Sequence, residues 1–345
     1  MRPALSDAAV RSGLGVQLTR LDCNERAVPP GPTVSAELGR WWTGLHRYPS
    51  TDDRQALISA LSFRHDLDTQ RFVVGAGSAS LLQLLARVLP AGSEVVAPDP
   101  TWEAHPDLLT THGAVWRPVP MTGPVVDLDT VAAAMTSRTS AVVLTSPHNP
   151  TGFALGQREW LRFLEYVPED VLVVLDEAYT EYLPEGDWAD GIRTLRELNP
   201  SNLVVTRTFS KAYGLAGLRV GWAATSRVRA RELNEHQIPF GVGTLGLRAA
   251  VAALADESVH QAQVSAMRRE REWLHEQFLA LGLPSVCGHG NFLWLPLGDD
   301  SAHLVGALKR RGIAVKLVPG AGIRVTIGAR DEHDALLRAL GDALR

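Results

Sequence analysis

Short runs of apolar, often β-branched residues alternate with longer helical patterns through the middle of this 345-residue chain. The runs cover residues 94–97, 141–145, 171–175, 203–206 and 218–223. Strands without polar interruptions are typical of a parallel sheet that helices cover on both faces. The intervening segments 80–89, 128–135, 156–166 and 191–198 predict crossover helices. The pattern therefore predicts an α/β domain whose mostly parallel sheet is sandwiched between helices.

The last hundred residues follow a different pattern and predict a smaller α+β domain. Two helices are expected at 244–255 and 258–281, followed by strands near 291–296, 313–318 and 323–327, with a helix at 302–311 and another at the end. Prolines at 24–33 predict a loop, and a second break falls at 237–243. We expect an N-terminal arm or small-domain segment at 1–45, a large domain at 46–235 and a small domain at 236–345.

Composition excludes several classes of partner. A net charge of −4 leaves no basic surface for nucleic acid or an anionic membrane. The start of the chain lacks the apolar segment of a signal peptide, and no apolar run approaches the roughly 20 residues of a membrane span. Cys23 and Cys287 show no metal-binding spacing. We expect a cytoplasmic protein with no bound metal.

One lysine stands out, because only three of the 34 basic residues are lysines. Lys211 lies in Thr-Phe-Ser-Lys-Ala-Tyr-Gly, directly after an apolar run. Such an amine can form a Schiff base with a carbonyl cofactor. Arg219 and the hydroxyls of Thr208 and Ser210 are suited to binding a phosphate. Taken alone, Lys211 is better explained as a lysine on a surface loop, and it is the combination with the neighbouring motifs that favours the cofactor.

Two further motifs follow neighbouring apolar runs. Asp176 ends one run and Tyr179 comes three residues later, while Asn149 follows the run before it. Ligands of open α/β sheets bind beyond the carboxyl ends of the strands, which is where these side chains are expected. An anionic Asp176 can keep a pyridine nitrogen protonated, although an aspartate there also serves commonly as a helix N-cap.

A turn of small residues, Gly75-Ala76-Gly77-Ser78-Ala79-Ser80, comes before a predicted helix. Its free backbone N–H groups are suited to an anion such as a phosphate. A nicotinamide enzyme is a weaker alternative, because the dinucleotide fingerprint lacks its third glycine. Trp102 can stack on a flat ring, although a lone tryptophan is more often part of the core.

Together these motifs make the chain similar to the fold-type I pyridoxal-phosphate aminotransferases, and within them to the histidinol-phosphate aminotransferase-like branch. The resemblance runs from about Leu21 to the C-terminus and includes several motifs in the expected order. They are Leu-Asp-Cys-Asn-Glu at 21–25, Arg-Tyr-Pro at 47–49, the turn at 75–78, Pro-Thr-Trp at 100–102, Pro-His-Asn-Pro-Thr-Gly at 147–152, Asp-Glu-Ala-Tyr at 176–179, the Lys211 segment at 207–221 and Ile-Arg-Val-Thr-Ile-Gly at 323–328.

The resemblance implies a role for each matching residue. Lys211 would hold pyridoxal 5′-phosphate and move the substrate proton, Asp176 would pair with the pyridine nitrogen, and Tyr179 and Asn149 would bind the phenolic oxygen. Trp102 would stack on the ring, and Tyr48 would reach the phosphate from the partner subunit of a homodimer. Arg324 would bind the substrate carboxylate, and Asn24 would contact the substrate. The residues that would bind the phosphate within the chain are Gly77, Ser78, Ala79, Thr208, Ser210 and Arg219.

Departures from the family pattern leave the substrate open. The acidic pair that usually follows the phosphate turn is replaced by Ala79 and Ser80, and Lys316 stands where an arginine is common. We expect transamination of an amino acid or related amine, with a β-eliminating lyase or a decarboxylase as the alternative on the same fold. A non-catalytic binding module is less favoured, because every catalytic position is filled.

Overall fold

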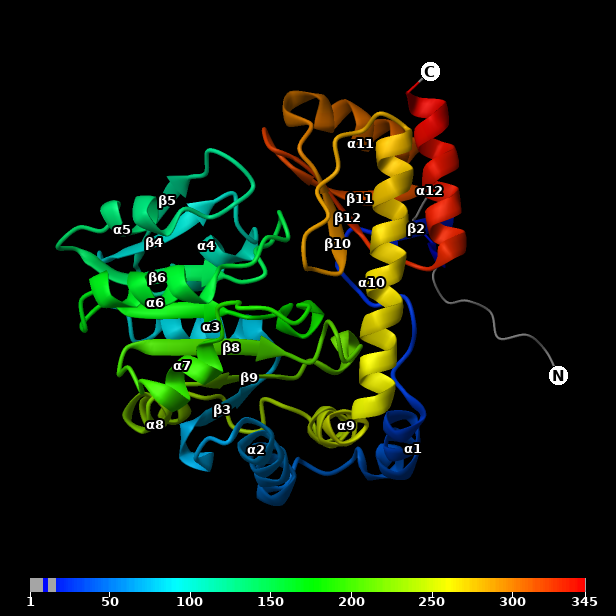
Figure 1. The fold of residues 1–345 in the computed structure, drawn as a ribbon. Coiled ribbons are helices and arrows are strands. Elements are labelled where there is room, and N and C mark those ends of the chain that lie inside the picture. Colours follow the sequence, from blue (N-terminus) through cyan, green and yellow to red (C-terminus); the bar gives the residue numbers. More distant parts are fainter. Residues whose placement is uncertain (1–8, 12–16, 345) are drawn as a thin grey trace.

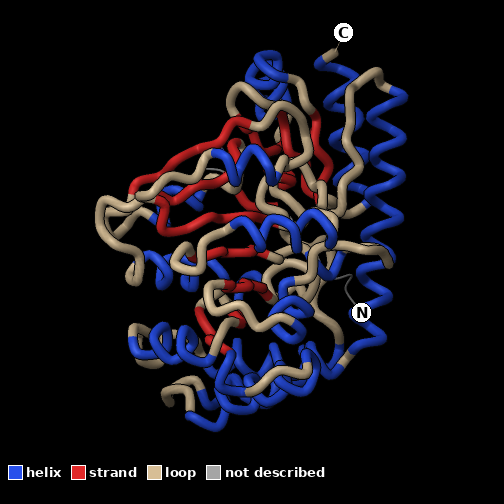
Figure 2. The backbone as a smooth tube through the Cα atoms, turned by 60° about the vertical axis from the view of Figure 1, so that its left-hand side comes forward, coloured by secondary structure: helices blue, strands red, loops and turns tan. Residues whose placement is uncertain are grey.

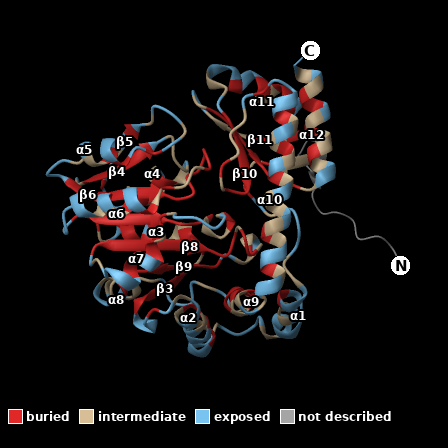
Figure 3. Cartoon of the chain, in the orientation of Figure 1, coloured by how far each residue is buried: buried red, intermediate tan, exposed pale blue. Residues whose placement is uncertain are grey.

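Two β-sheets organise the chain in the computed structural model, which describes residues 9–11 and 17–344. The large sheet has seven strands, and only β9 runs antiparallel to its neighbours. Their order across the sheet is β3 (Phe72–Gly75), β9 (Gly221–Ala224), β8 (Leu203–Thr208), β7 (Leu172–Asp176), β6 (Thr139–Thr145), β4 (Glu94–Asp99) and β5 (Val115–Pro120). The strands are buried from end to end over most of the sheet, as Figure 3 shows.

Successive residues of the central strands pack into two different cores, because side chains of a strand alternate between the two faces of the sheet. Val173 and Val205 belong to the first core, and Val174 and Val204 to the second. Helices on both sides of the strands complete these cores (Figure 2). The first contains residues of α1 (Pro32–Trp41), α2 (Thr51–His65), α5 (Leu128–Ala133), α6 (Gln157–Tyr166), α7 (Gly191–Glu197) and α9 (Thr244–Ala255), and the second those of α3 (Ser78–Ala86), α4 (Ala104–Leu109) and α8 (Arg227–Glu235).

The small sheet joins the two ends of the chain. Its order is β1 (Ala9–Arg11), β2 (Gln17–Leu21), β11 (Ile313–Val318), β12 (Gly322–Thr326) and β10 (Phe292–Leu295), with β2 parallel to β11. It shares a core with α10 (Glu257–Ala280), α11 (Ser301–Arg310) and α12 (Arg330–Ala343). The long helix α10 runs from α9 to this sheet along one side of the molecule (Figure 1).

The predicted α/β class is confirmed, and each apolar run contains or overlaps a strand. Two local expectations are wrong. The loop expected at 24–33 ends early, because α1 begins at Pro32; a proline is favourable at the first helical position, where the N–H needs no partner within the helix. The run at 218–223 forms a strand only from Gly221, after a short 3₁₀ helix at Ala216–Leu218.

The domain boundaries expected at residues 45 and 235 stay predictions. Val34 from α1 and Leu247 from α9 lie in the same core as the first face of the large sheet. Residues 1–8 and 12–16 of the expected N-terminal arm lie outside the described part of the chain. Within the described ranges, no helix is both long and apolar enough to cross a membrane.

Candidate active site

A cavity of about 430 Å³ lies at the carboxyl ends of β6, β7 and β8, where the large sheet faces the small one. Its volume is within the roughly 300–1,000 Å³ that small-ligand sites occupy. All but two of the residues predicted for the site line this cavity. They are Asn24, Ser78, Ala79, Trp102, Asn149, Asp176, Tyr179, Thr208, Ser210, Lys211, Arg219 and Arg324.

The other two predicted residues lie outside the lining. Gly77 comes directly before α3 and packs against Arg219. Tyr48 is 79% exposed and stacks on Phe240, with the ring centroids 4.8 Å apart. Within a single chain the structure therefore does not bring Tyr48 into the cavity.

Lys211 follows the end of β8, and its amine points across the cavity to the N-terminal segment. The Lys211 Nζ donates to the carbonyl oxygen of Cys23 at 2.9 Å. Burial lowers the pKa of this amine to about 8, and the positive charge of Arg324 acts in the same direction. A considerable fraction of Lys211 is therefore neutral near physiological pH and able to act as a nucleophile or a base.

Asp176 ends β7, and its two carboxylate oxygens have different partners. Oδ1 accepts from the backbone N–H of Ala178 at 3.1 Å, and Oδ2 lies 3.4 Å from Nε2 of His105. His105 is fully buried in α4, and its Nδ1 lies 3.0 Å from the Thr101 hydroxyl. Sequence reasoning missed His105. The available signal was its position three residues after Trp102, because a turn brings residues i and i+3 together; here the N–H of His105 donates to the Trp102 carbonyl at 2.9 Å.

Polar side chains from both sheets meet at Tyr179. Its hydroxyl accepts from Asn24 Nδ2 at 2.9 Å and from Asn149 Nδ2 at 3.4 Å. Burial raises the pKa of this hydroxyl, so that Tyr179 stays protonated and can donate to an oxygen in the cavity. Arg324 Nη1 donates to Asn149 Oδ1 at 2.6 Å, and its Nη2 donates to the carbonyl of Asp22 at 2.7 Å. The buried Nε of Arg324 has no partner among the described residues.

The start of α3 forms an anion-binding corner with the Lys211 segment. Helix α3 begins without a side-chain cap, so its first N–H groups are available to a ligand. Arg219 Nη1 lies 3.3 Å from Ser210 Oγ, which also accepts from Thr208 Oγ1 at 2.9 Å. Gly77 has a φ of +81°, which L side chains rarely adopt, and a Cβ there would lie 2.6 Å from Arg219 Nη2, so this approach favours glycine. The corner has the donors and the positive charge that a phosphate needs.

Lys316 and Glu103 add an ion pair to the lining that the sequence did not predict. Lys316 lies opposite Arg324 in the register of β11 and β12. Its amine contacts Glu103 at 2.5 Å, which links the small sheet to the residue after Trp102. The positive charge of Lys316 is therefore paired with a carboxylate of the protein, Glu103.

The combined donor set fits pyridoxal phosphate, which has an aldehyde, a pyridine nitrogen, a phenolic oxygen and a phosphate. Lys211 supplies an amine, Asp176 an acid, Tyr179 a phenol, and the corner at Arg219 an anion site, all around one cavity. Among residues 9–11 and 17–344 no cluster of His, Cys, Asp or Glu is suited to a metal ion. Lys211, Asp176, Tyr179 and the corner at Arg219 make the cavity a candidate site for such an organic cofactor.

Comparisons with known proteins agree with this geometry. The family model described as aminotransferase class I and II matches residues 42–340. An aromatic amino acid aminotransferase of Thermobifida fusca is 40% identical over 319 residues, covering 92% of this chain and 88% of that protein. One of Streptomyces coelicolor is 36% identical over 339 residues, covering 98% and 92%.

A solved structure gives the same result. The histidinol-phosphate aminotransferase of Sinorhizobium meliloti, in complex with pyridoxal-5′-phosphate, matches with a TM-score of 0.88 at 27% identity, covering 94% of this chain and 90% of that one. The expected fold and enzyme class are both confirmed. The chain belongs to the class I and II aminotransferase family.

Proposed function

We propose that this chain is a pyridoxal 5′-phosphate-dependent aminotransferase that acts on aromatic amino acids. The observation that carries the proposal is that Lys211, Asp176 and Arg324 line one cavity. They supply the amine, the acid and the carboxylate clamp that the reaction needs. The substrate class is taken from the relatives, whose names specify aromatic amino acids.

The residues around the ring site would hold and polarise the cofactor. Lys211 would bind it covalently through its amine, Asp176 would pair with the pyridine nitrogen, and Tyr179 and Asn149 would donate to the phenolic oxygen. When bound, the cofactor supplies an electron-withdrawing ring that stabilises negative charge at the substrate Cα. His105 would hold the Asp176 carboxylate toward that ring, since its Nε2 lies 3.4 Å from Oδ2.

The anion-binding corner would take the cofactor's phosphate. Its charge would be balanced by Arg219 and by the N-terminal end of α3, where negative charge is favoured. Trp102 lines the same cavity and would cover one face of the ring. The complete set assigned to the phosphate is Gly77, Ser78, Ala79, Thr208, Ser210 and Arg219.

Lys211 also has the properties of the general base. With a pKa near 8, its amine can accept the proton from the substrate Cα and return it elsewhere at neutral pH. Arg324 would bind the substrate α-carboxylate, because its buried Nε has no partner in the part of the chain that the structure describes and still needs an acceptor. Asn24 lies beside Tyr179 and would contact the substrate from the N-terminal segment.

The Lys316–Glu103 pair supports a substrate with an uncharged side chain. A phosphorylated substrate needs a positive charge near its phosphate, and Lys316 is already neutralised by Glu103. An aromatic side chain requires no such charge. The pair therefore favours aromatic amino acids over histidinol phosphate, the substrate named for the similar structure from Sinorhizobium meliloti.

The proposed enzyme is a homodimer in which Tyr48 reaches the phosphate of the partner's site. The support is its exposure in the single chain and its contact with exposed Phe240; Trp42 and Leu45, a few residues earlier in the chain, are exposed as well. Exposed apolar patches of this kind mark protein contacts. We also propose a cytoplasmic location, which agrees with two free cysteines.

Product analysis tests the proposed reaction. The purified enzyme would be incubated with phenylalanine, tyrosine, tryptophan, histidinol phosphate and serine, each with a 2-oxo acid acceptor, and the products identified by mass spectrometry. We expect aromatic 2-oxo acids and an aminated acceptor. Carbon dioxide, or ammonia with pyruvate, would instead indicate the decarboxylase or the lyase. Preferential turnover of histidinol phosphate would overturn the aromatic assignment and leave the aminotransferase assignment intact.

A further inference from the structure

A buried ion pair, Glu177 with Arg207, lies directly behind the cavity and is not part of its lining. Glu177 follows Asp176 and is fully buried, and Arg207 precedes Thr208. Glu177 Oε2 accepts from Arg207 Nε at 2.8 Å and lies 2.7 Å from its Nη2. Burial of an ion pair is costly unless its hydrogen bonds are well satisfied, so the pair calls for an explanation.

The two side chains of the pair lie on the opposite face of the sheet from the cofactor site. Asp176 is paired with Thr206 in the register of β7 and β8, so these residues point to one face. Their chain neighbours Glu177 and Arg207 therefore point to the other face, which α7 covers. The pair joins the carboxyl ends of the two strands without entering the cavity.

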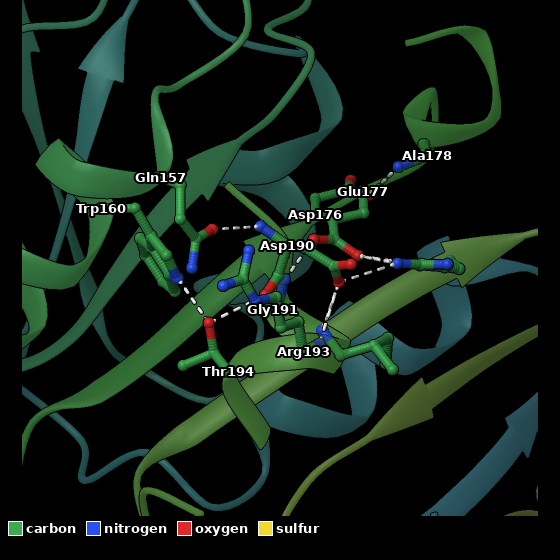
Figure 4. Close-up of polar contacts among 11 residues, drawn as sticks. Gln157, Trp160, Asp176, Glu177, Ala178, Asp190, Gly191, Arg193 and Thr194 are labelled. Atoms are coloured by element: carbon green, nitrogen blue, oxygen red, sulfur yellow. Dashed lines mark hydrogen bonds and ion pairs between the residues drawn. The ribbon is translucent and has the colours of Figure 1, made fainter. Parts of the chain in front are cut away.

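Helix α7 completes the arrangement around the Glu177 carboxylate (Figure 4). Glu177 Oε1 accepts from the backbone N–H of Gly191 at 2.7 Å. Arg207 Nη2 lies 3.5 Å from Asp190, the N-cap of that helix. A Cβ at Gly191 would collide with Val205, so the helix start is pressed against β8. Three chain segments thus meet at one carboxylate.

We propose that Glu177 and Arg207 are positioning residues that fix the spacing between Asp176 on β7 and the Lys211 segment after β8. The proposal rests on the proposed function of those two residues, since it concerns how they are held toward one cofactor. Asp176 is one residue from Glu177, and Lys211 is four residues from Arg207. A shift of either strand end would move the pyridine partner relative to the amine.

An ion pair suits this task better than apolar packing does. Arg207 contacts one oxygen of the Glu177 carboxylate and the N–H of Gly191 donates to the other. Such directed hydrogen bonds fix both distance and direction, whereas apolar contact is non-directional. Burial raises the pKa of Glu177 to about 7, although Arg207 and the N–H of Gly191 oppose the rise. The charged form therefore depends on its partners, and loss of one bond weakens the whole arrangement.

Replacement of the carboxylate by an amide is the sharpest test, because Glu177→Gln keeps the size of the side chain. The amide has one acceptor oxygen and one NH₂ group. Its NH₂ group must therefore lie against a second donor, either the guanidinium of Arg207 or the N–H of Gly191, and one hydrogen bond is lost. Glu94→Gln is the matched control. Glu94 is also buried and bound to Arg138, but it lies at the start of β4, at the other end of the strands.

The holoenzymes would be compared in three ways: the rate of cofactor release, the pH midpoint of the bound cofactor's absorbance, and the melting temperature. We expect Glu177→Gln to release pyridoxal phosphate roughly 10-fold faster, the lower end of the effects known for residues that orient metal ligands. We also expect its absorbance midpoint to move. Glu94→Gln should lower the melting temperature without changing the release rate or the absorbance midpoint. The release rate and midpoint of Arg207→Lys should lie between those of Glu177→Gln and those of the unmodified enzyme.

Each result separates the explanations. If Glu177→Gln melts earlier but keeps the release rate and midpoint of the unmodified enzyme, the pair is structural only and the proposal is wrong. If Glu94→Gln releases cofactor equally fast, general loosening explains the effect and the proposal also fails. If Glu177→Gln does not fold, Arg207→Lys carries the same comparison. An unmodified enzyme that binds no pyridoxal phosphate would refute the proposed function instead.

Discussion

At the scale of single residues, the amine of Lys211 is the group whose environment most affects its chemistry. Burial and the nearby Arg324 both oppose its protonation, and its hydrogen-bond partner is the Cys23 carbonyl. A lysine in water near pH 7 is almost entirely protonated and has no free electron pair. Lys211 keeps a usable neutral fraction because the folded protein makes the charge less favourable.

This environment predicts how fast the amine captures the cofactor at different pH values. The cofactor-stripped enzyme would be mixed with pyridoxal phosphate from about pH 6 to about pH 10, and the rate followed by absorbance. Below the pKa the amine is protonated and cannot attack, so we expect the rate to rise through about pH 8 and then level off. A midpoint near 10 would contradict the lowered pKa.

Borohydride reduction of the enzyme with bound cofactor should attach the cofactor permanently to Lys211 and leave Lys211→Ala unlabelled.

Glu103 gives a second prediction, which concerns substrate selection. Glu103→Gln removes the partner of Lys316 and leaves a positive charge in the cavity lining. We expect activity with acidic or phosphorylated amino donors to rise relative to phenylalanine by up to about 5-fold, since exposed pairs contribute at most about 1 kcal/mol. The ratio of kcat/KM values measures this shift.

The double variant Glu103→Gln with Lys316→Met is the control for that experiment. It removes the freed charge, so the preference should return toward that of the unmodified enzyme. An equal gain in the double variant would show that Lys316 has no part in the shift.

At the scale of elements, the junction between β3 and α3 shapes the anion-binding corner. Gly77 has a φ of +81°, a conformation that L side chains rarely adopt, and Arg219 fills the space where a Cβ would lie. Arg219 itself has a φ of +51° and donates to Ser210. The corner therefore depends on two unusual backbone conformations that face each other.

Gly77→Ala is expected to weaken pyridoxal phosphate binding, because the methyl group would displace Arg219 from the phosphate corner. Loss of a hydrogen bond to a charged group costs about 1.5–3 kcal/mol, or roughly 10- to 150-fold in the cofactor dissociation constant. Fluorescence titration of the stripped enzyme measures this constant. Gly123→Ala is the control, because its Cβ would meet nothing within 4 Å. Unchanged affinity in Gly77→Ala would mean that the phosphate binds elsewhere.

The elements also show which parts of the fold can be predicted from sequence. Buried central strands such as β6 and β7 were found because uninterrupted apolar runs have few alternative structures. The edge strand β5 was missed because five of its six residues are partly or mostly exposed and two are prolines. Helix α2 was missed although its capping box, Ser50 with Asp53, is a recognisable signal.

At the scale of the whole molecule, the cavity exists only because distant segments meet. The N–H of Asn24 donates to Thr326 Oγ1 at 2.9 Å, although 302 residues separate them. The parallel pairing of β2 with β11 brings these ends together. Motifs that are close in the chain could be assigned to one site from their spacing. That Asn24, Tyr179 and Arg324 belong to the same site followed only from the family resemblance, because long-range contacts leave no local pattern in the sequence.

Tyr48 is the predicted site residue whose role depends on a second chain. It lies outside the cavity of its own chain, and its ring stacks on Phe240 at the surface. A symmetric dimer would place the same surface of each chain against the other. If Tyr48 serves the partner's phosphate, each site takes Lys211 from one chain and Tyr48 from the other.

This arrangement predicts that two defective chains restore each other's activity. Lys211→Ala and Tyr48→Phe enzymes would be unfolded, mixed in equal amounts and refolded together, with refolded unmodified enzyme as the reference. Half of the randomly formed dimers are mixed, and each mixed dimer has one site with both residues intact, so about a quarter of all sites should regain full activity. Each variant refolded alone is the control. If mixed dimers form, as mass spectrometry can establish, but activity does not exceed the mean of the controls, Tyr48 does not act across the interface.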